Sequence, residues 1–142
     1  MKSKGGTVVT ALKLALMFGV TALAPMQTAI AAGNAQSGQM IFATSCAICH
    51  KVGPDAANAL GPVLNGVVGR KAGAYPNYNY SQANLKSGLT WDEATLTKYL
   101  HSPMAVVPGT AMIFAGFADD QQVADVIAYL NTFAPDGKPA AK

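Results

Sequence analysis

The sequence is poor in the side chains that build most metal and thiol sites. Its 142 residues include only two cysteines, Cys46 and Cys49, and two histidines, His50 and His101. A structural zinc site needs about four ligands, and the scarcity of further cysteine and histidine disfavours one. A thioredoxin-like thiol pair would need a strand before it and a βαβ unit after it, and the sequence pattern offers neither.

Charge is also scarce, since Asp, Glu, Lys and Arg make up 12% of the chain. The formal net charge of +3 comes from the first 31 residues, which hold three of the ten Lys and Arg residues and none of the seven Asp and Glu residues. The remaining residues carry seven charges of each sign and offer no basic patch. This balance disfavours a nucleic-acid partner.

The first 31 residues have the pattern of a secretory signal peptide. A positive start with Lys2 and Lys4 precedes an apolar run and the small residues Ala29-Ile30-Ala31. The apolar run is interrupted by Pro25 and is short of the roughly 20 residues that span a bilayer. We therefore expect cleavage after about Ala31, export to the periplasm, and a single mature domain over residues 32–142.

Helical signals dominate the mature part of the chain. One helix is expected to begin after Asn34 and to run into the sequence CAICH at residues 46–50. A second is expected from Thr90, with a capping box to Glu93, to a point before Pro103, and a third from about Asp119 to a point before residues 134–137. Residues 81–87 suggest a further short helix. Residues 32–37 and 134–142 are expected to be loose ends.

The middle of the chain is a long segment rich in glycine and proline, with no sustained alternation of apolar residues. Loops of that length are uncommon in a compact domain. Three helices with few large aliphatic side chains also make a thin core. A large apolar cofactor wrapped by the loop would resolve both problems.

The sequence CAICH could attach such a cofactor. Cys46 and Cys49 stand three residues apart and His50 follows at once. If the segment is helical, the two sulfurs lie on one side with His50 beside them. Covalent attachment of haem c, with the histidine as an iron ligand, uses all three residues and suits an exported protein.

The second axial position on the iron has several candidates. Met40 precedes Cys46 by only six residues and is better suited to packing. Met104 and His101 follow the second long helix, and Met112 lies further along the same irregular segment. Spacing alone leaves both Met104 and Met112 able to reach the iron.

Three motifs occur together in an order that resembles class I cytochrome c, of the mitochondrial type and its bacterial relatives. These are CAICH, the run VPGTAMIFAGF at residues 107–117, and an apolar C-terminal helix. The resemblance covers about residues 38–130. It implies an all-α fold of about four helices, with long loops around one covalently bound haem.

The resemblance also implies roles for individual residues. Met112 matches the second axial ligand, and Pro62 matches the residue whose carbonyl holds the His50 ring. Further matches place Arg70, Tyr80 and Trp91 at the haem propionates, Tyr99 and Thr110 near the methionine sulfur, and Gly38, Phe42 and Tyr129 where the terminal helices cross.

A haem with both axial positions filled favours electron transfer over catalysis. The resemblance therefore implies a monomeric carrier that is not an enzyme. It would dock transiently on membrane proteins, between a cytochrome bc complex and a terminal oxidase or photosynthetic reaction centre. Two alternatives are a haem peroxidase or ligand sensor with a labile methionine, and an electron acceptor for a periplasmic dehydrogenase.

The chain departs from the mitochondrial pattern in its charge. Ala111 occupies a position where relatives often have lysine, and residues 101–117 contain no lysine or arginine. An apolar rim is expected instead, formed by Ala105, Val106, Val107, Ala111, Ile113 and Phe114. We expect electrostatic steering of the partner to be weak.

Overall fold

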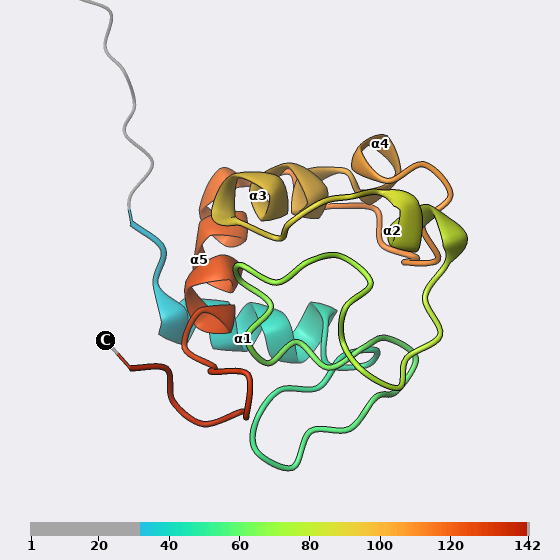
Figure 1. The fold of residues 1–142 in the computed structure, drawn as a ribbon. Coiled ribbons are helices and arrows are strands. Elements are labelled where there is room, and N and C mark those ends of the chain that lie inside the picture. Colours follow the sequence, from blue (N-terminus) through green and yellow to red (C-terminus); the bar gives the residue numbers. More distant parts are fainter. Residues whose placement is uncertain (1–31, 142) are drawn as a thin grey trace, which may run out of the picture.

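The computed structural model describes residues 32–141, so the expected signal peptide lies outside the described residues. Five helices, α1 (Ala35–Ser45), α2 (Gln82–Lys86), α3 (Glu93–His101), α4 (Pro103–Val106) and α5 (Asp120–Leu130), are joined by long loops (Figure 1). Extended pairing within this part is limited to two isolated bridges, Lys71 with Thr90 and Phe133 with Pro139. The all-α expectation is confirmed, and the short α4 brings the helix number to five.

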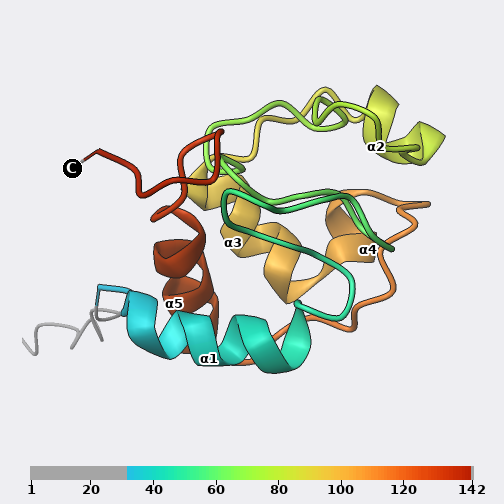
Figure 2. The same ribbon diagram turned by 90° about the horizontal axis from the view of Figure 1, so that it is seen from below.

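Helices α1 and α5, from the two ends of the domain, cross and pack directly on one another (Figure 2). Gly38 is the point of closest approach, because a Cβ there would collide with the backbone carbonyl of Asp125. The rings of Phe42 and Tyr129 meet beside it with centroids 5.4 Å apart. The predicted crossing of the terminal helices at these side chains is therefore confirmed.

Polar caps fix the starts of the long helices. Asn34 accepts from the amides of Gln36 and Ser37, as expected for α1. The expected start of α3 at Thr90 is wrong: Asp92 is the cap and accepts from the Thr95 amide. An aspartate side chain is a better N-cap acceptor than threonine, which explains the shift of two residues.

Helix α1 ends earlier than predicted, at Ser45, so the CAICH segment is not part of it. The amide of Ala47 bonds to Phe42 five residues back at 2.8 Å, which widens the last turn. The amides of Cys49 and His50 then both bond to the Cys46 carbonyl, at 3.0 and 2.9 Å. The two cysteines therefore lie on a tight turn that leads out of the helix.

Residues in both segments expected to be loose, 32–37 and 134–142, make specific contacts in the structure. The Asn34 amide donates to the buried Asp125 carboxylate at 2.7 Å. In the C-terminal segment, a Cβ at Gly137 would collide with the carbonyl of Gly53. Close packing of this kind was not visible in the small and polar sequence of either end.

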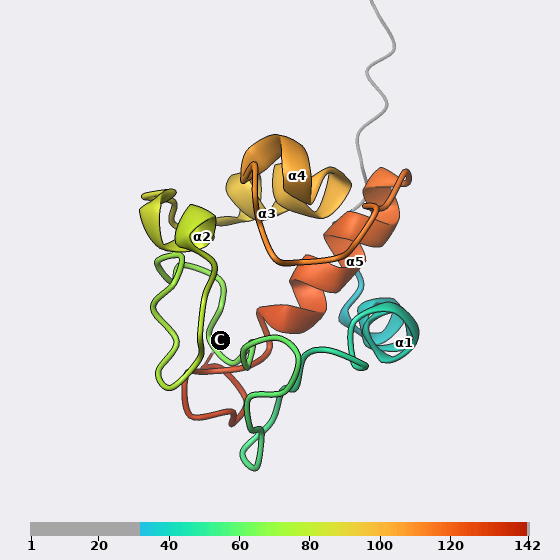
Figure 3. The ribbon, with the colours of Figure 1, turned by 90° about the vertical axis from the view of Figure 1, so that its right-hand side faces the viewer.

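The loop of residues 50–81 closes the face of the molecule opposite α3. Figure 3 shows it beside α1 and below α2. Asn58 links it internally, because its amide nitrogen donates to the carbonyls of Pro76 and Asn77, both at 3.0 Å. Within residues 32–141, no helix has the length and apolar character needed to cross a membrane.

Candidate functional site

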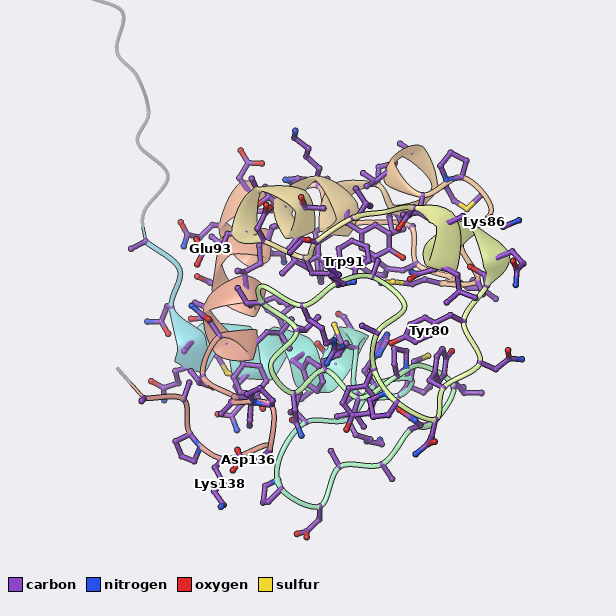
Figure 4. The ribbon with its side chains drawn as sticks, viewed as in Figure 1. Tyr80, Lys86, Trp91, Glu93, Asp136 and Lys138 are labelled. Carbon is purple, nitrogen blue, oxygen red and sulfur yellow. The ribbon has the colours of Figure 1, made fainter. Side chains whose placement is uncertain are left out.

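A cavity of about 440 Å³ lies between α1, α3, α5 and the loops. Its volume is in the range of pockets that enclose organic ligands. All ten residues that the sequence singled out line this cavity: Cys46, Cys49, His50, Pro62, Arg70, Tyr80, Trp91, Tyr99, Thr110 and Met112. Figure 4 shows Trp91 beneath α3 and Tyr80 toward α2. The fold thus gathers side chains from five separate stretches of sequence.

The attachment turn places both thiols at the cavity, half-buried and not joined in a disulfide. Burial, reinforced by the neighbouring Cys49, raises the pKa of the Cys46 thiol to about 11. A thiol with so high a pKa is a poor free nucleophile. Burial thus disfavours Cys46 as the attacking thiolate of a redox-active pair.

The His50 ring is held from two sides. Its Nδ1 donates to the Pro62 carbonyl at 2.7 Å, as the resemblance implied. A Cβ at Gly61 would collide with the same ring, so only glycine leaves room for it. Burial lowers the pKa of His50, and the charge of Arg70 lowers it further, against the Pro62 bond. A neutral ring oriented through Nδ1 presents Nε2 as a metal ligand.

The Arg70 side chain is held in place by contacts within the protein. Its guanidinium donates to the carbonyls of Asn65 at 2.8 Å and Val63 at 3.0 Å, and it stacks 4.9 Å from the Tyr75 ring centroid. Burial lowers the pKa of Arg70, but arginine remains charged in proteins. The side chain therefore brings a fixed positive charge to the cavity wall.

Tyr80 and Trp91, which carry polar hydrogens, line the same cavity as Arg70. The Tyr80 oxygen accepts from the Tyr75 amide at 3.3 Å, which leaves its own hydrogen free to donate. The Trp91 ring packs against Tyr99 with centroids 4.7 Å apart. This corner of the cavity suits an anionic group.

Met112 is the one candidate sulfur ligand of the described residues that lines the cavity. The Tyr99 and Thr110 hydroxyls meet at 3.0 Å, and the Thr110 oxygen accepts from the Met112 amide at 3.2 Å. Met104 lies on α4 and Met40 on α1, and both are mostly exposed. The geometry separates Met112 from Met104, which sequence spacing could not do.

Sequence reasoning missed Asn84 on α2. Its Oδ1 is buried at the cavity and has no hydrogen-bond partner among the described residues. Buried polar atoms are rarely left unpaired, so this oxygen indicates that a polar group completes the site. An asparagine in a short polar helix carries no sequence signal of such a role.

Comparison with known proteins agrees with this geometry. The Cytochrome c family profile matches residues 35–134. Cytochrome c2 of Rhodomicrobium vannielii is 53% identical over 86% of this chain and 95% of its own, and cytochrome c2 of Blastochloris viridis is 47% identical over the same shares. The structure of cytochrome cH from Methylobacterium extorquens is 48% identical with a TM-score of 0.66, and the match covers 70% of this chain and 99% of that one.

The chain belongs to the cytochrome c family, as a class I c-type cytochrome with one covalent haem c. The residues present fit that group. The paired thiols fit its attachment, the glycine-framed His50 ring fits its ligation, the fixed charge of Arg70 fits its anionic edge, and the apolar cavity fits its bulk. Its relatives are electron-carrier cytochromes, and this chain is an electron carrier that works with other redox proteins.

Proposed function

We propose that this cytochrome is a periplasmic one-electron shuttle between a cytochrome bc complex and a terminal oxidase or photosynthetic reaction centre. The observation that carries the proposal is that His50 and Met112 line the same cavity as the two attachment cysteines. If His50 and Met112 both bound the iron, no coordination site would be left for oxygen or peroxide. The arrangement supports a carrier rather than an enzyme.

Each side chain has a definable task in this proposal. Cys46 and Cys49 anchor the haem, whose iron supplies the reversible one-electron chemistry. The Pro62 carbonyl orients His50, while Thr110 and Tyr99 place Met112. A thioether is a soft ligand and favours reduced iron relative to a second histidine.

The polar side chains at one corner of the cavity would stabilise the negative charge of the haem propionates. In the proposal, Arg70 contributes its fixed charge, and Tyr80 and Trp91 donate hydrogen bonds. Asn84 lines the same cavity, and the NH2 end of its amide can donate to a carboxylate. Burying carboxylates requires such partners, because an unpaired charge in a low-dielectric site is costly.

The mouth of the cavity provides the surface for electron exchange. Ile48, Leu60 and Ile113 line the cavity and are largely exposed. The expected rim needs one correction: Val107 is buried, because it packs in the core behind the loop. The remaining rim is apolar, and a redox partner would dock there through a small contact.

The test is a pair of methionine variants of the mature haem protein. Met112→Ala should keep the covalent haem, lose the weak far-red sulfur-to-iron band, lower the reduction potential and admit cyanide or carbon monoxide. Met104→Ala should do none of these, because Met104 is exposed on α4. Loss of the band in Met104→Ala instead would overturn the assignment. A wild-type protein without the band would favour a peroxidase or ligand sensor.

A further inference from the structure

Helix α3 holds both ends of the segment that carries Met112, residues 107–117, called the Met112 loop below. Near one end, the Tyr99 and Thr110 hydroxyls meet at 3.0 Å. At the other end, the Phe117 amide donates to the Leu100 carbonyl at 2.9 Å. Adjacent residues of one helix thus fix the loop before and after Met112.

His101, the next residue of α3, strengthens the second of these anchors. Its Nδ1 lies 2.7 Å from the Phe117 carbonyl, and its Nε2 lies 3.0 Å from the Asp120 carboxylate. The backbone of Gly116 has a φ of +100° and passes so close that a Cβ would collide with the His101 carbonyl. One ring therefore ties the end of the Met112 loop to the start of α5.

The two partners of the ring are both acceptors. A carbonyl oxygen and an ionised carboxylate have no hydrogen to give. The contacts are complete only when Nδ1 and Nε2 both carry hydrogen, in the singly charged imidazolium. A neutral ring can donate to one partner only and presents a lone pair to the other.

We infer that His101 is a positioning residue for Met112, and that its protonated ring holds the Met112 loop closed. The inference rests on the proposed role of Met112 as iron ligand. When the ring loses a proton, one of its two bonds is lost and the end of the loop loosens. Met112 then leaves its site more readily, without general unfolding of the protein.

The charges around His101 are few. On α5 they are Asp119, whose Oδ1 is already bonded to the amides of Gln121 and Gln122, and Asp120 itself. On α3 they are Glu93 and Lys98. Helix α4 and the Met112 loop contain no ionisable side chain. Asp120 is thus the carboxylate that acts directly on the ring.

The experiment measures, at a single pH and imidazole concentration, how fast imidazole replaces Met112 in the oxidised haem protein, by bleaching of the far-red band. His101→Gln should bleach roughly five- to tenfold faster than wild type, because a neutral amide cannot replace a charge-assisted bond. His101→Arg keeps a charged donor and should restore slow bleaching.

Asp120→Asn should bleach faster than wild type but more slowly than His101→Gln. Asp136→Asn is its control, because it removes the same charge from an exposed pair, 3.3 Å from Lys138, in the C-terminal segment. Equal bleaching rates in wild type and His101→Gln would overturn the inference. The inference would also be overturned if His101→Gln lowered the global free energy of unfolding enough to explain its whole change in bleaching rate. His101 would then only stabilise the fold.

Amide hydrogen exchange at Phe117 gives a readout that does not depend on the ligand. It should be faster in His101→Gln than in Asp136→Asn at the same pH, because the Phe117 amide is bonded within the anchor. Retention of the band in Met112→Ala would refute the proposed ligand. In that case unchanged Phe117 exchange in His101→Gln would refute the loop anchor separately.

Discussion

At the scale of single residues, glycine controls the position of the proposed iron ligand. Gly61 precedes Pro62, whose carbonyl accepts from His50, and its missing side chain makes room for the ring. The His50 ring is therefore framed by two consecutive backbone units. A rigid frame of this kind keeps a ligand in one orientation in both oxidation states.

Gly61→Ala should push the His50 ring away and lengthen its bond to Pro62. We expect a changed visible spectrum and a loss of about 1–3 kcal/mol of stability, typical of overpacking. Spectra and denaturant unfolding of the haem protein would measure both. Gly69→Ala is the control, because its Cβ would meet open space at a φ of +86°. It should cost stability through backbone strain but leave the spectrum unchanged, and a shared spectral change would contradict the contact with His50.

At the scale of elements, the crossing of α1 and α5 positions the attachment turn. Helix α1 ends at Ser45, one residue before Cys46, so its placement against α5 determines where the thiols lie. The apolar side of the contact includes Phe42, Val123, Val126 and Ile127, all buried. Gly38 allows the two backbones to approach closely enough for this packing.

Gly38→Ala should separate the two helices and destabilise the haem protein by about 1–3 kcal/mol or more, because the Asp125 carbonyl cannot move without disturbing α5. Denaturant unfolding followed by far-UV circular dichroism would show it. Gln39→Ala, at the adjacent exposed position of α1, should be close to neutral. If Gly38→Ala left the free energy of unfolding unchanged, the two helices would be packed less closely than the structure shows.

The sequence predicted these elements well where a local signal exists. Asn34, Pro103 and the apolar repeat of α5 mark helix ends and faces directly, so α1, α3 and α5 were expected within a few residues. The end of α1 was missed because a widened last turn leaves no mark on helical spacing. The bond of Asn34 to Asp125 was missed because it joins residues 91 positions apart.

The candidate site was predictable for a different reason. CAICH and the run around Met112 resemble a family whose motifs are specific in combination. Position within the cavity was needed to separate Met112 from Met104 and to find Asn84. The anchoring of the Met112 loop by His101 depends on a contact across 16 residues and on backbone approach at Gly116. Neither leaves a periodic pattern.

At the scale of the whole molecule, the mature part carries charges of both signs in equal number. Figure 4 shows Lys86 at the right edge, Glu93 at the left edge, and Asp136 and Lys138 at the lower edge. The large side chains exposed at the cavity mouth, Ile48, Leu60 and Ile113, are apolar. We therefore expect long-range attraction to contribute little to the meeting with a partner.

The rate of electron exchange with a redox partner should change only a few-fold as the Debye length falls from about 30 Å at 0.01 M salt to about 10 Å at 0.1 M. A steered pair would lose on the order of tenfold or more. Stopped-flow measurements on the mature protein would test this. Ile113→Lys, at a fully exposed position of the rim, should slow the exchange, whereas Met40→Lys on α1 should not. A steep salt dependence would show that the scattered lysines form an effective patch.

The crossing of the first and last helices also constrains how the protein is made. Synthesis proceeds from the N-terminus, so α1 and the two cysteines emerge long before α5 exists. Until then α1 has no partner to pack against, and an isolated helix of eleven residues is marginal in water. The two thiols, which are half-buried at the cavity in the fold, are therefore open in the growing chain. The architecture leaves an interval in which an attachment enzyme can reach the cysteines, and that interval closes when the final helix docks.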